Sequence, residues 1–402
     1  MLKIGLIKEG KVPPDNRVAL TPQQCRYLID RFSVDIAVAP SSIRAYRDEE
    51  YAKLGIPLCE DLTDRDILLG IKEVPVEQLM AGKTYFFFSH TIKMQPYNRH
   101  LLQAILEKRI RLIDYEVLTD ESGKRVIAFG YFAGMAGAHN TIYALGQRMG
   151  AFDLVRMKDC HDYAAVKRHY AHLPLPPVKI VLTGTGRVGR GAAQVLRDMG
   201  IQQVSPQTFL EDTFSQAVFT QIGALWYVRR RDGRPFDRAD FYAHPEAYES
   251  AFEPFTQVAD VMIHGIYWDP AAPRFFTRQD MMRANFRIRT IGDVTCDIAP
   301  NASIPCTLRP STIADPVYGY DPATNSEVPP YQAAFFDVMA VDNLPSELPR
   351  DASHAFGQQF IEYVFPELLK PHSEMLDRAT IAIDGHLGPH FTYLDEYVAN
   401  KA

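Results

Sequence analysis

Short apolar runs alternate with helix-period segments along most of this chain, and this alternation restricts its fold more than any other feature. In the first third, the runs are apolar on successive residues rather than on every second one. Such strands are buried on both faces, which is typical of parallel sheets covered by helices. We expect strands over residues 3–7, 34–39, 66–71, 84–89 and 111–116. The pattern predicts an α/β fold.

Helical segments separate these runs. The first follows Thr21 and Pro22, an N-cap residue followed by proline at the first helical position. Residues 131–149 predict a long helix in spite of three glycines, each of which costs up to about 1 kcal/mol relative to alanine in a helix interior. We therefore expect this helix to pack closely against another element.

A proline-rich approach over residues 173–180 precedes a second set of strand candidates, and helical segments near 351–370 and 373–380 end the chain. The length of 402 residues also favours two domains over a single core. We predict two Rossmann-like domains with parallel sheets and an active-site cleft between them.

Composition excludes several classes of partner. A net charge of −6 without a basic tail argues against binding to nucleic acid or to an anionic membrane surface. No apolar stretch approaches the roughly 20 residues of a membrane span. Five scattered cysteines, without metal-binding spacing, are typical of reduced thiols. With no secretory signal in the first residues, we expect a cytoplasmic protein without a metal.

The most specific motif is "TGTGRVGRG", in which Gly184, Gly186 and Gly189 form G-x-G-x-x-G between a strand and a helix. These glycines permit a tight turn and the close approach of a pyrophosphate to the helix N-terminus. Dinucleotide binding is favoured over a simple glycine-rich turn because the motif has the required strand–turn–helix context. The loop residues expected to bind the cofactor are Gly184, Thr185, Gly186, Arg187, Val188 and Gly189.

A ribose-binding carboxylate should follow about 20 residues later, at the end of the next strand. Counting reaches Ser205, whereas the acids Glu211 and Asp212 fall in the following segment. Because no carboxylate at this position would repel a 2′-phosphate, we expect NADP(H) in preference to NAD(H). No single arginine, however, is clearly placed to bind that phosphate.

Titratable side chains gather at the predicted carboxyl ends of the first strands, where open α/β sheets bind ligands. They are Arg17, Lys72, Glu73, His90, Lys93, Asp114, Glu116 and Arg125. Taken singly, a lysine after a strand is usually solvated, and a histidine there is usually paired with a backbone group. Together, three cations suit substrate carboxylates, and a lysine with a histidine suits proton exchange near neutral pH.

Six segments resemble those of a known family: "NRVALTP", "GIKEVP", "FSHTIKMQ", "RLIDYE", "RVIAFGYFAGMAG" and "GTGRVGRGA". The sequence resembles the alanine dehydrogenase and saccharopine dehydrogenase superfamily over nearly its whole length. It is more similar to the lysine–2-oxoglutarate reductase half of aminoadipic semialdehyde synthase and to the fungal saccharopine dehydrogenases. "HGIYWDPAAPRFFTRQD", "STIADPVYGYD" and "VDNLPSELPRDAS" favour the reductase half.

The resemblance implies reduction of the imine of L-lysine and 2-oxoglutarate to saccharopine, with a nicotinamide cofactor. It implies Lys72 and His90 as acid–base residues. It also implies substrate binding by Arg17, Lys93, Arg125, Glu73 and Glu116, although the reductase half has a basic residue where Glu73 stands. It also implies that Asp293, Asp342 and Leu344 lie near the nicotinamide. For the two aspartates, capping of a following turn is an equally good interpretation.

The same resemblance implies a substrate domain of residues 1–135 plus 346–402 and a dinucleotide domain of residues 136–345. The expected partners are small molecules, and the expected assembly is a monomer or a small homo-oligomer. Three alternatives stay open. They are an alanine dehydrogenase-like enzyme with one small amino acid, a related enzyme that uses another amine, and a regulator that binds NADP without turnover.

Overall fold

The computed structural model describes residues 1–171 and 173–399, and the chain divides into two compact units. Unit 1 comprises Met1–Phe129 with Pro349–Ala402, and unit 2 comprises Gly130–Leu348. The sequence-based boundaries at 135 and 346 lie a few residues from these. No helix among the described residues is long and apolar enough to cross a membrane. The five cysteines are free.

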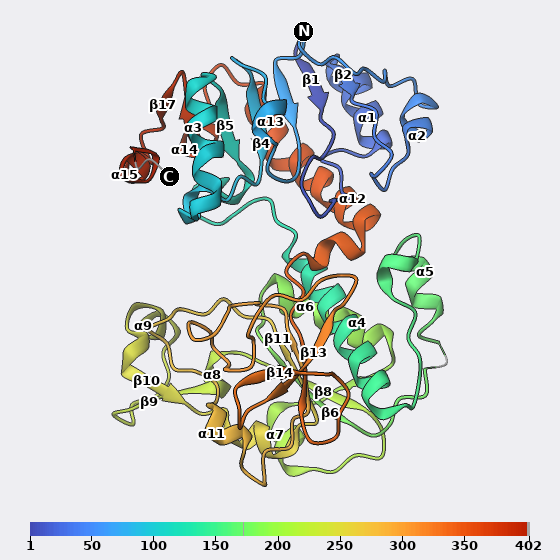
Figure 1. Cartoon of the computed structure of the whole chain (residues 1–402), viewed down its shortest axis with the longest axis vertical. Coiled ribbons are helices and arrows are strands. Elements are labelled where there is room, and N and C mark those ends of the chain that lie inside the picture. The colour runs from blue at the N-terminus through green and yellow to red at the C-terminus, as the bar shows by residue number, and fades with distance from the viewer. Residues whose placement is uncertain (172, 400–402) are drawn as a thin grey trace. The chain divides into compact units, whose positions relative to one another are not determined.

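Unit 1 contains a seven-stranded sheet in the order β17-β16-β5-β4-β3-β1-β2 (Figure 1). Its strands are β1 (Lys3–Leu6), β2 (Asp35–Val38), β3 (Ile67–Leu69), β4 (Thr84–Phe87), β5 (Arg111–Asp114), β16 (Thr380–Ile383) and β17 (His386–Leu387). The first five are the predicted strands, and they are parallel. The sequence did not predict β16, which pairs antiparallel with β5, or β17.

The helices of unit 1 come from both ends of the chain. They are α1 (Pro22–Phe32), α2 (Asp48–Ala52), α3 (Arg99–Glu107), α12 (Pro349–Gln359), α13 (Phe365–Leu368), α14 (Glu374–Arg378) and α15 (Asp395–Ala399). Thr21 and Gln24 form a capping box at the start of α1, as the sequence indicated. The backbone N–H of Val18 donates to Ser353 Oγ of α12 at 2.9 Å, so the C-terminal segment is part of this unit.

Unit 2 contains an eight-stranded sheet in the order β14-β13-β15-β12-β11-β6-β8-β7. Its strands are β6 (Lys179–Thr183), β7 (Gln202–Gln203), β8 (Val218–Ile222), β11 (Val261–His264), β12 (Thr290–Asp293), β13 (Val317–Asp321), β14 (Ser326–Val328) and β15 (Phe336–Met339). The strands from β15 to β7 are parallel, and β13 and β14 are antiparallel additions.

Eight α-helices and a two-stranded ribbon among the described residues complete unit 2. The ribbon joins β9 (Val228–Arg230) to β10 (Tyr248–Ser250). The helices are α4 (Gly130–Met149), α5 (Tyr163–Arg168), α6 (Arg187–Asp198), α7 (Pro206–Glu211), α8 (Ala224–Tyr227), α9 (Arg238–Ala243), α10 (Glu253–Val258) and α11 (Arg278–Met281).

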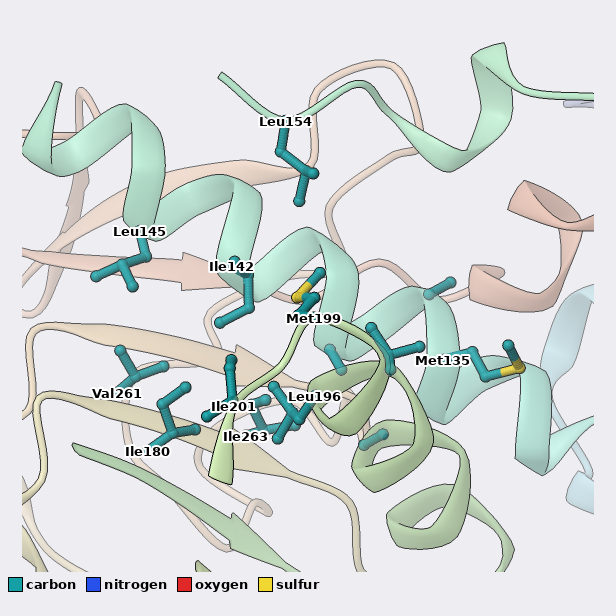
Figure 2. Close-up of a cluster of buried hydrophobic side chains, with 14 of the residues drawn as sticks. Met135, Ile142, Leu145, Leu154, Ile180, Leu196, Met199, Ile201, Val261 and Ile263 are labelled. Atoms are coloured by element: carbon teal, nitrogen blue, oxygen red, sulfur yellow. The ribbon is translucent and has the colours of Figure 1, made fainter. Parts of the chain in front are cut away.

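The glycine-rich helix α4 packs closely against α6, which confirms the prediction from its composition. A Cβ on Gly134 would lie 1.9 Å from the carbonyl oxygen of Val188, and a Cβ on Gly191 would lie 1.9 Å from that of Tyr131. The same helix closes the core of unit 2, where Figure 2 shows Ile142 and Leu145 directed toward the strands. Burial of such side chains contributes roughly 1.5–3 kcal/mol each.

Candidate active site

The carboxyl ends of β3 and β4 bring the two expected acid–base residues onto neighbouring strands. The two strands are parallel, and the backbone N–H of Phe88 donates to the carbonyl of Ile71 at 2.9 Å, just beyond the ladder. Lys72 and His90 follow this last bond by one and two residues, respectively. The strand-end position predicted from the sequence is therefore shared by both residues.

His90 is held by Glu73, the residue after Lys72. The Nδ1 of His90 lies 2.5 Å from Glu73 Oε1, and Lys11 Nζ lies 3.1 Å from Glu73 Oε2. Burial would raise the pKa of Glu73, but its hydrogen bond to His90, the charge of His90 and that of Lys11 lower it to about 2. Because Glu73 is then ionised, Nδ1 is the donor, and Nε2 is left to exchange protons.

His90 also has an unusual backbone. Its φ of 54° lies in the left-handed region, where histidine is uncommon, and it precedes a short 3-10 turn over Thr91–Lys93. Ser89 fixes this turn, since its N–H and its hydroxyl donate to Asp114 Oδ2 at 2.8 and 2.6 Å. The end of β4 is thereby tied to the end of β5, and His90 is fixed by its backbone as well as by Glu73.

Lys72 is a partly buried lysine, and the described residues offer its side-chain ammonium no hydrogen-bond or ion-pair partner. Burial, followed by the charges of Arg17 and Lys11, lowers its pKa from 10.5 to about 8. A lysine with this pKa exchanges protons readily near neutral pH. It is the strongest acid–base candidate in unit 1.

The segment after β1 contacts the backbone at Lys72, and the sequence indicated only Arg17 in this segment. Glu9 accepts hydrogen bonds from the N–H groups of Ile71 and Lys72 at 2.6 and 2.9 Å. Burial and the charge of Asp15 raise the pKa of Glu9 to about 8. The available signal was position: β1 is the sheet neighbour of β3, so residues after both strands share one edge.

Arg17 differs from its expected role as a carboxylate ligand. Its side chain is buried, at 2 % exposure, and its Nε and Nη2 donate to Asp15 at 2.9 and 2.6 Å. Its guanidinium also lies 4.2 Å from the centre of the Phe129 ring. Because Asp15 and Phe129 engage this cation, the geometry favours a role in the charge balance around Lys72.

The remaining expected substrate ligands meet around Glu116. Lys93 Nζ lies 3.7 Å from Glu116 Oε2, and Arg125 Nη1 lies 3.9 Å from Glu116 Oε1. Arg125 also donates from Nε to the carbonyl of Ile127. Both ion pairs are long, so one carboxylate is shared by two cations.

In unit 2, the glycine motif forms the loop that the sequence predicted between β6 and α6. Gly184 has a φ of 95°, and a Cβ there would lie 2.3 Å from the carbonyl oxygen of Gly265. A Cβ on Gly189 would lie 1.9 Å from the oxygen of Gly184, whereas a Cβ on Gly186 would meet nothing within 4 Å. This open space at the N-terminus of α6 suits a pyrophosphate, so the loop fits a dinucleotide. Thr185 completes the turn, and Arg187 and Val188 begin α6.

A cavity of about 480 Å³ adjoins this loop. Gly184, Thr185 and Gly186 form one side of it, and residues after β8 and β11 form the others. These two strands flank β6 in the sheet. The place and the size suit the adenosine half of a dinucleotide.

The structure does not place Ser205 where the count from the glycine motif expected it. Ser205 follows β7, but β8 lies between β7 and β6, so the neighbouring strand end is that of β8. Ser205 instead caps α7, accepting a hydrogen bond from the N–H of Thr208 at 3.1 Å. The count failed because it assumed that the next strand in sequence is the next in the sheet.

The residues expected near a nicotinamide differ in burial and in hydrogen bonding. Asp293 is buried at the end of β12, accepts from Thr307 Oγ1 at 2.6 Å and accepts from the N–H of Thr295 and Cys296. This is the turn-capping role that was the alternative. Leu344 is buried in the core of unit 2, and Asp342 is exposed.

Two comparisons concern the fold. A family model described as "Alanine dehydrogenase/PNT, N-terminal domain" matches residues 5–136. The solved structure of an L-alanine dehydrogenase superposes with a TM-score of 0.65 at 17% identity, over 99% of this chain and 100% of that one. The two largely parallel sheets agree with the fold of that structure, and the match over residues 5–136 relates this part of the chain to the alanine dehydrogenase/PNT family.

Two curated relatives are similar to nearly the whole chain. The mitochondrial alpha-aminoadipic semialdehyde synthase of Rattus norvegicus is 30% identical over 95% of this chain. The chain spans 46% of that protein's length. The lysine-forming, NAD(+)-dependent saccharopine dehydrogenase of Emericella nidulans is 28% identical over 92% of each chain. The chain is thus similar over nearly its whole length to part of the synthase and to almost all of the saccharopine dehydrogenase.

Proposed function

We propose that this protein is an oxidoreductase that interconverts saccharopine with L-lysine and 2-oxoglutarate, using NADP(H) in preference to NAD(H). The observation that carries the proposal is the pairing of strand ends at Lys72 and His90. One is a partly buried lysine with a pKa of about 8 and the other is a histidine oriented by a carboxylate. The family relationship supports the choice of substrates.

The reaction requires several proton transfers. The ε-amine of lysine must lose a proton before it attacks the ketone of 2-oxoglutarate, and the resulting carbinolamine must lose water to form an imine. Addition of a hydride to the imine carbon and of a proton to the nitrogen gives saccharopine. In this proposal Lys72 and the Nε2 of His90 donate and accept these protons, because the pKa of Lys72 is about 8 and Glu73 orients the imidazole of His90.

The cations near these groups would bind the substrate carboxylates. Lys93 and Arg125 share Glu116 through long ion pairs, and in this proposal their charges attract a substrate carboxylate. Lys93 is 46% exposed at its side chain, so it can be reached from solvent. Glu73 would act through His90 and not by contact with substrate, because its two oxygens face His90 and Lys11.

A bound nicotinamide cofactor would supply or accept the hydride. The residues of this chain that would hold it are those of the loop Gly184–Gly189 and of the adjoining cavity. Gly186 leaves room for the pyrophosphate, and the N–H groups that begin α6 can donate to it.

The test measures, by absorbance, the oxidation of NADPH and of NADH in the presence of 2-oxoglutarate, with and without L-lysine. We expect oxidation that requires lysine, and its loss in the double variant Lys72→Met with His90→Gln. Oxidation with ammonia and pyruvate but not with lysine would instead show an alanine dehydrogenase-like enzyme. Oxidation with other amines alone would show a related enzyme with a different amine substrate.

A further inference from the structure

The strand end beside the nucleotide loop carries no acid. β8 is the neighbour of β6, and it leads into Gly223 and Ala224. Proteins selective for NAD place an aspartate or glutamate at this point to bind the ribose 2′-hydroxyl. The residue before the end, Gln221, is engaged, since its Nε2 donates to the carbonyl of Gly184 at 2.8 Å. No carboxylate from β8 would therefore repel a 2′-phosphate.

An arginine lines the same cavity. Arg238 begins the short helix α9, between the two strands of the ribbon that follows β8, and it is among the residues that line the cavity with Gly186. It is exposed, and the described residues provide it with no hydrogen-bond or ion-pair partner. Its charge reaches the Tyr227 hydroxyl on the cavity wall and opposes the rise in the pKa of that group.

The other arginines of the ribbon are committed to acids. Arg229 Nε donates to Glu249 at 2.7 Å, and Arg230 pairs with Asp232 and Asp240. Arg234 pairs with Asp232 at 2.7 Å. Arg238 is thus distinguished from its neighbours by both its position and its lack of a partner.

The rest of the lining suits a nucleoside. Tyr227, Tyr242, Tyr267 and Trp268 bring aromatic rings to the cavity. Of the described lining residues, one carries a carboxylate: Asp269, which follows β11 and whose Oδ1 accepts from the N–H of Ala271 at 2.8 Å. This acid follows β11, which flanks β6 on one side, whereas Arg238 belongs to the segment after β8, which flanks β6 on the other.

We propose that Arg238 binds the 2′-phosphate of the adenosine half of NADP(H) and thereby determines the cofactor preference of this protein. The inference rests on the proposed function only in placing a dinucleotide on the glycine loop, and it names a residue that the sequence motif did not indicate. A guanidinium can donate two parallel hydrogen bonds to a phosphate, which makes arginine well suited to this contact.

Equilibrium binding tests the proposal without turnover. Affinities of the purified chain would be measured by calorimetry for NADPH, NADH, adenosine 2′,5′-bisphosphate and adenosine 5′-monophosphate. The two adenosine ligands isolate the 2′-phosphate from the nicotinamide. The variants are Arg238→Ala and Arg238→Lys, with Arg229→Ala as a matched control, because that arginine is 70% exposed at its side chain and lies outside the cavity lining.

We expect Arg238→Ala to weaken NADPH and the bisphosphate by about tenfold to a hundredfold, the usual range for a charge-assisted hydrogen bond. NADH and the monophosphate should change less than about twofold, Arg238→Lys should retain part of the affinity, and the control should match the wild type. If the wild type prefers NADH, or Arg238→Ala weakens both dinucleotides equally, the inference is wrong while dinucleotide binding stands. Binding of neither dinucleotide would overturn the proposed function as well.

Discussion

Replacement of Lys72 by methionine should make the protein more stable and remove its activity. The pKa of Lys72 falls from 10.5 to about 8 on folding. This corresponds to about 3 kcal/mol by which the folded state disfavours the ammonium form. Methionine has a similar length and no charge, so it removes this cost. With allowance for solvent at the partly exposed side chain, we expect a gain of roughly 1–3 kcal/mol at pH 7.

The pH dependence of this gain follows from the direction of the pKa shift. Below about pH 8, Lys72 is charged in both states, and the folded wild type bears the full cost. Between pH 8 and 10.5 the folded protein binds fewer protons than the unfolded chain, so wild-type stability rises. The advantage of the variant should therefore be greatest below pH 8 and vanish above pH 10.5.

Calorimetry suits this measurement better than tryptophan fluorescence, because Trp226 and Trp268 both lie in unit 2 and Lys72 lies in unit 1. An exposed lysine at position 8 offers the matched control Lys8→Met. Loss of activity together with an unchanged or higher melting temperature would exclude misfolding as the cause. A variant that is less stable than the wild type at pH 7 would refute the reasoning.

The same lysine should set a limb of the pH–rate profile. In the wild type we expect an inflection of kcat/KM near pH 8, which Lys72→Arg should remove because a guanidinium does not lose its proton in this range. Lys11→Met should raise the inflection by a fraction of a pH unit, because Lys11 lowers the pKa of Lys72. An identical inflection in Lys72→Arg would show that another group titrates there.

Three further predictions concern the surroundings of this lysine and the nucleotide loop. Glu73→Gln leaves an acceptor for His90 but removes the charge that stabilises an imidazolium, so kcat should fall about tenfold to a hundredfold with little change in the melting temperature. Lys93→Met should raise KM for 2-oxoglutarate about tenfold and change kcat less, measured by steady-state kinetics; an unchanged KM would exclude a carboxylate contact. Gly134→Ala should destabilise unit 2 by about 3 kcal/mol, because its Cβ would meet a carbonyl oxygen at 1.9 Å. Gly130→Ala is its control in the same helix, since the nearest atom lies at 3.5 Å, and equal melting temperatures for the two variants would contradict the packing argument.

Much of the fold was predictable from local pattern. Continuous apolar runs indicated the five parallel strands of unit 1, and Thr21 with Pro22 marked the start of α1. The glycines of α4 predicted close packing because their cost in an isolated helix demands compensation. The strands β16 and β17 were missed, because β16 begins at Thr380 within a segment that was expected to be helical and β17 has only two residues.

The candidate site was predictable only in part. The residues after β3 and β4 indicated Lys72 and His90, because parallel strands bring their carboxyl ends to one edge of their sheet. The glycine motif after β6 indicated the loop in unit 2. Sequence could not show that Glu73 holds His90 or that Asp15 takes the guanidinium of Arg17. These partners depend on the directions of side chains, which spacing along the chain does not specify.

The sequence by itself thus determined the two largely parallel sheets, the glycine loop and the strand ends where the candidate site residues lie. Each of these depends on short-range periodicity or on the backbone freedom of glycine. Only the tertiary structure decided the order of strands around β6, which removed Ser205 from the ribose position and brought Arg238 to the cavity. Strand order depends on pairing between distant segments, and no local pattern encodes that pairing.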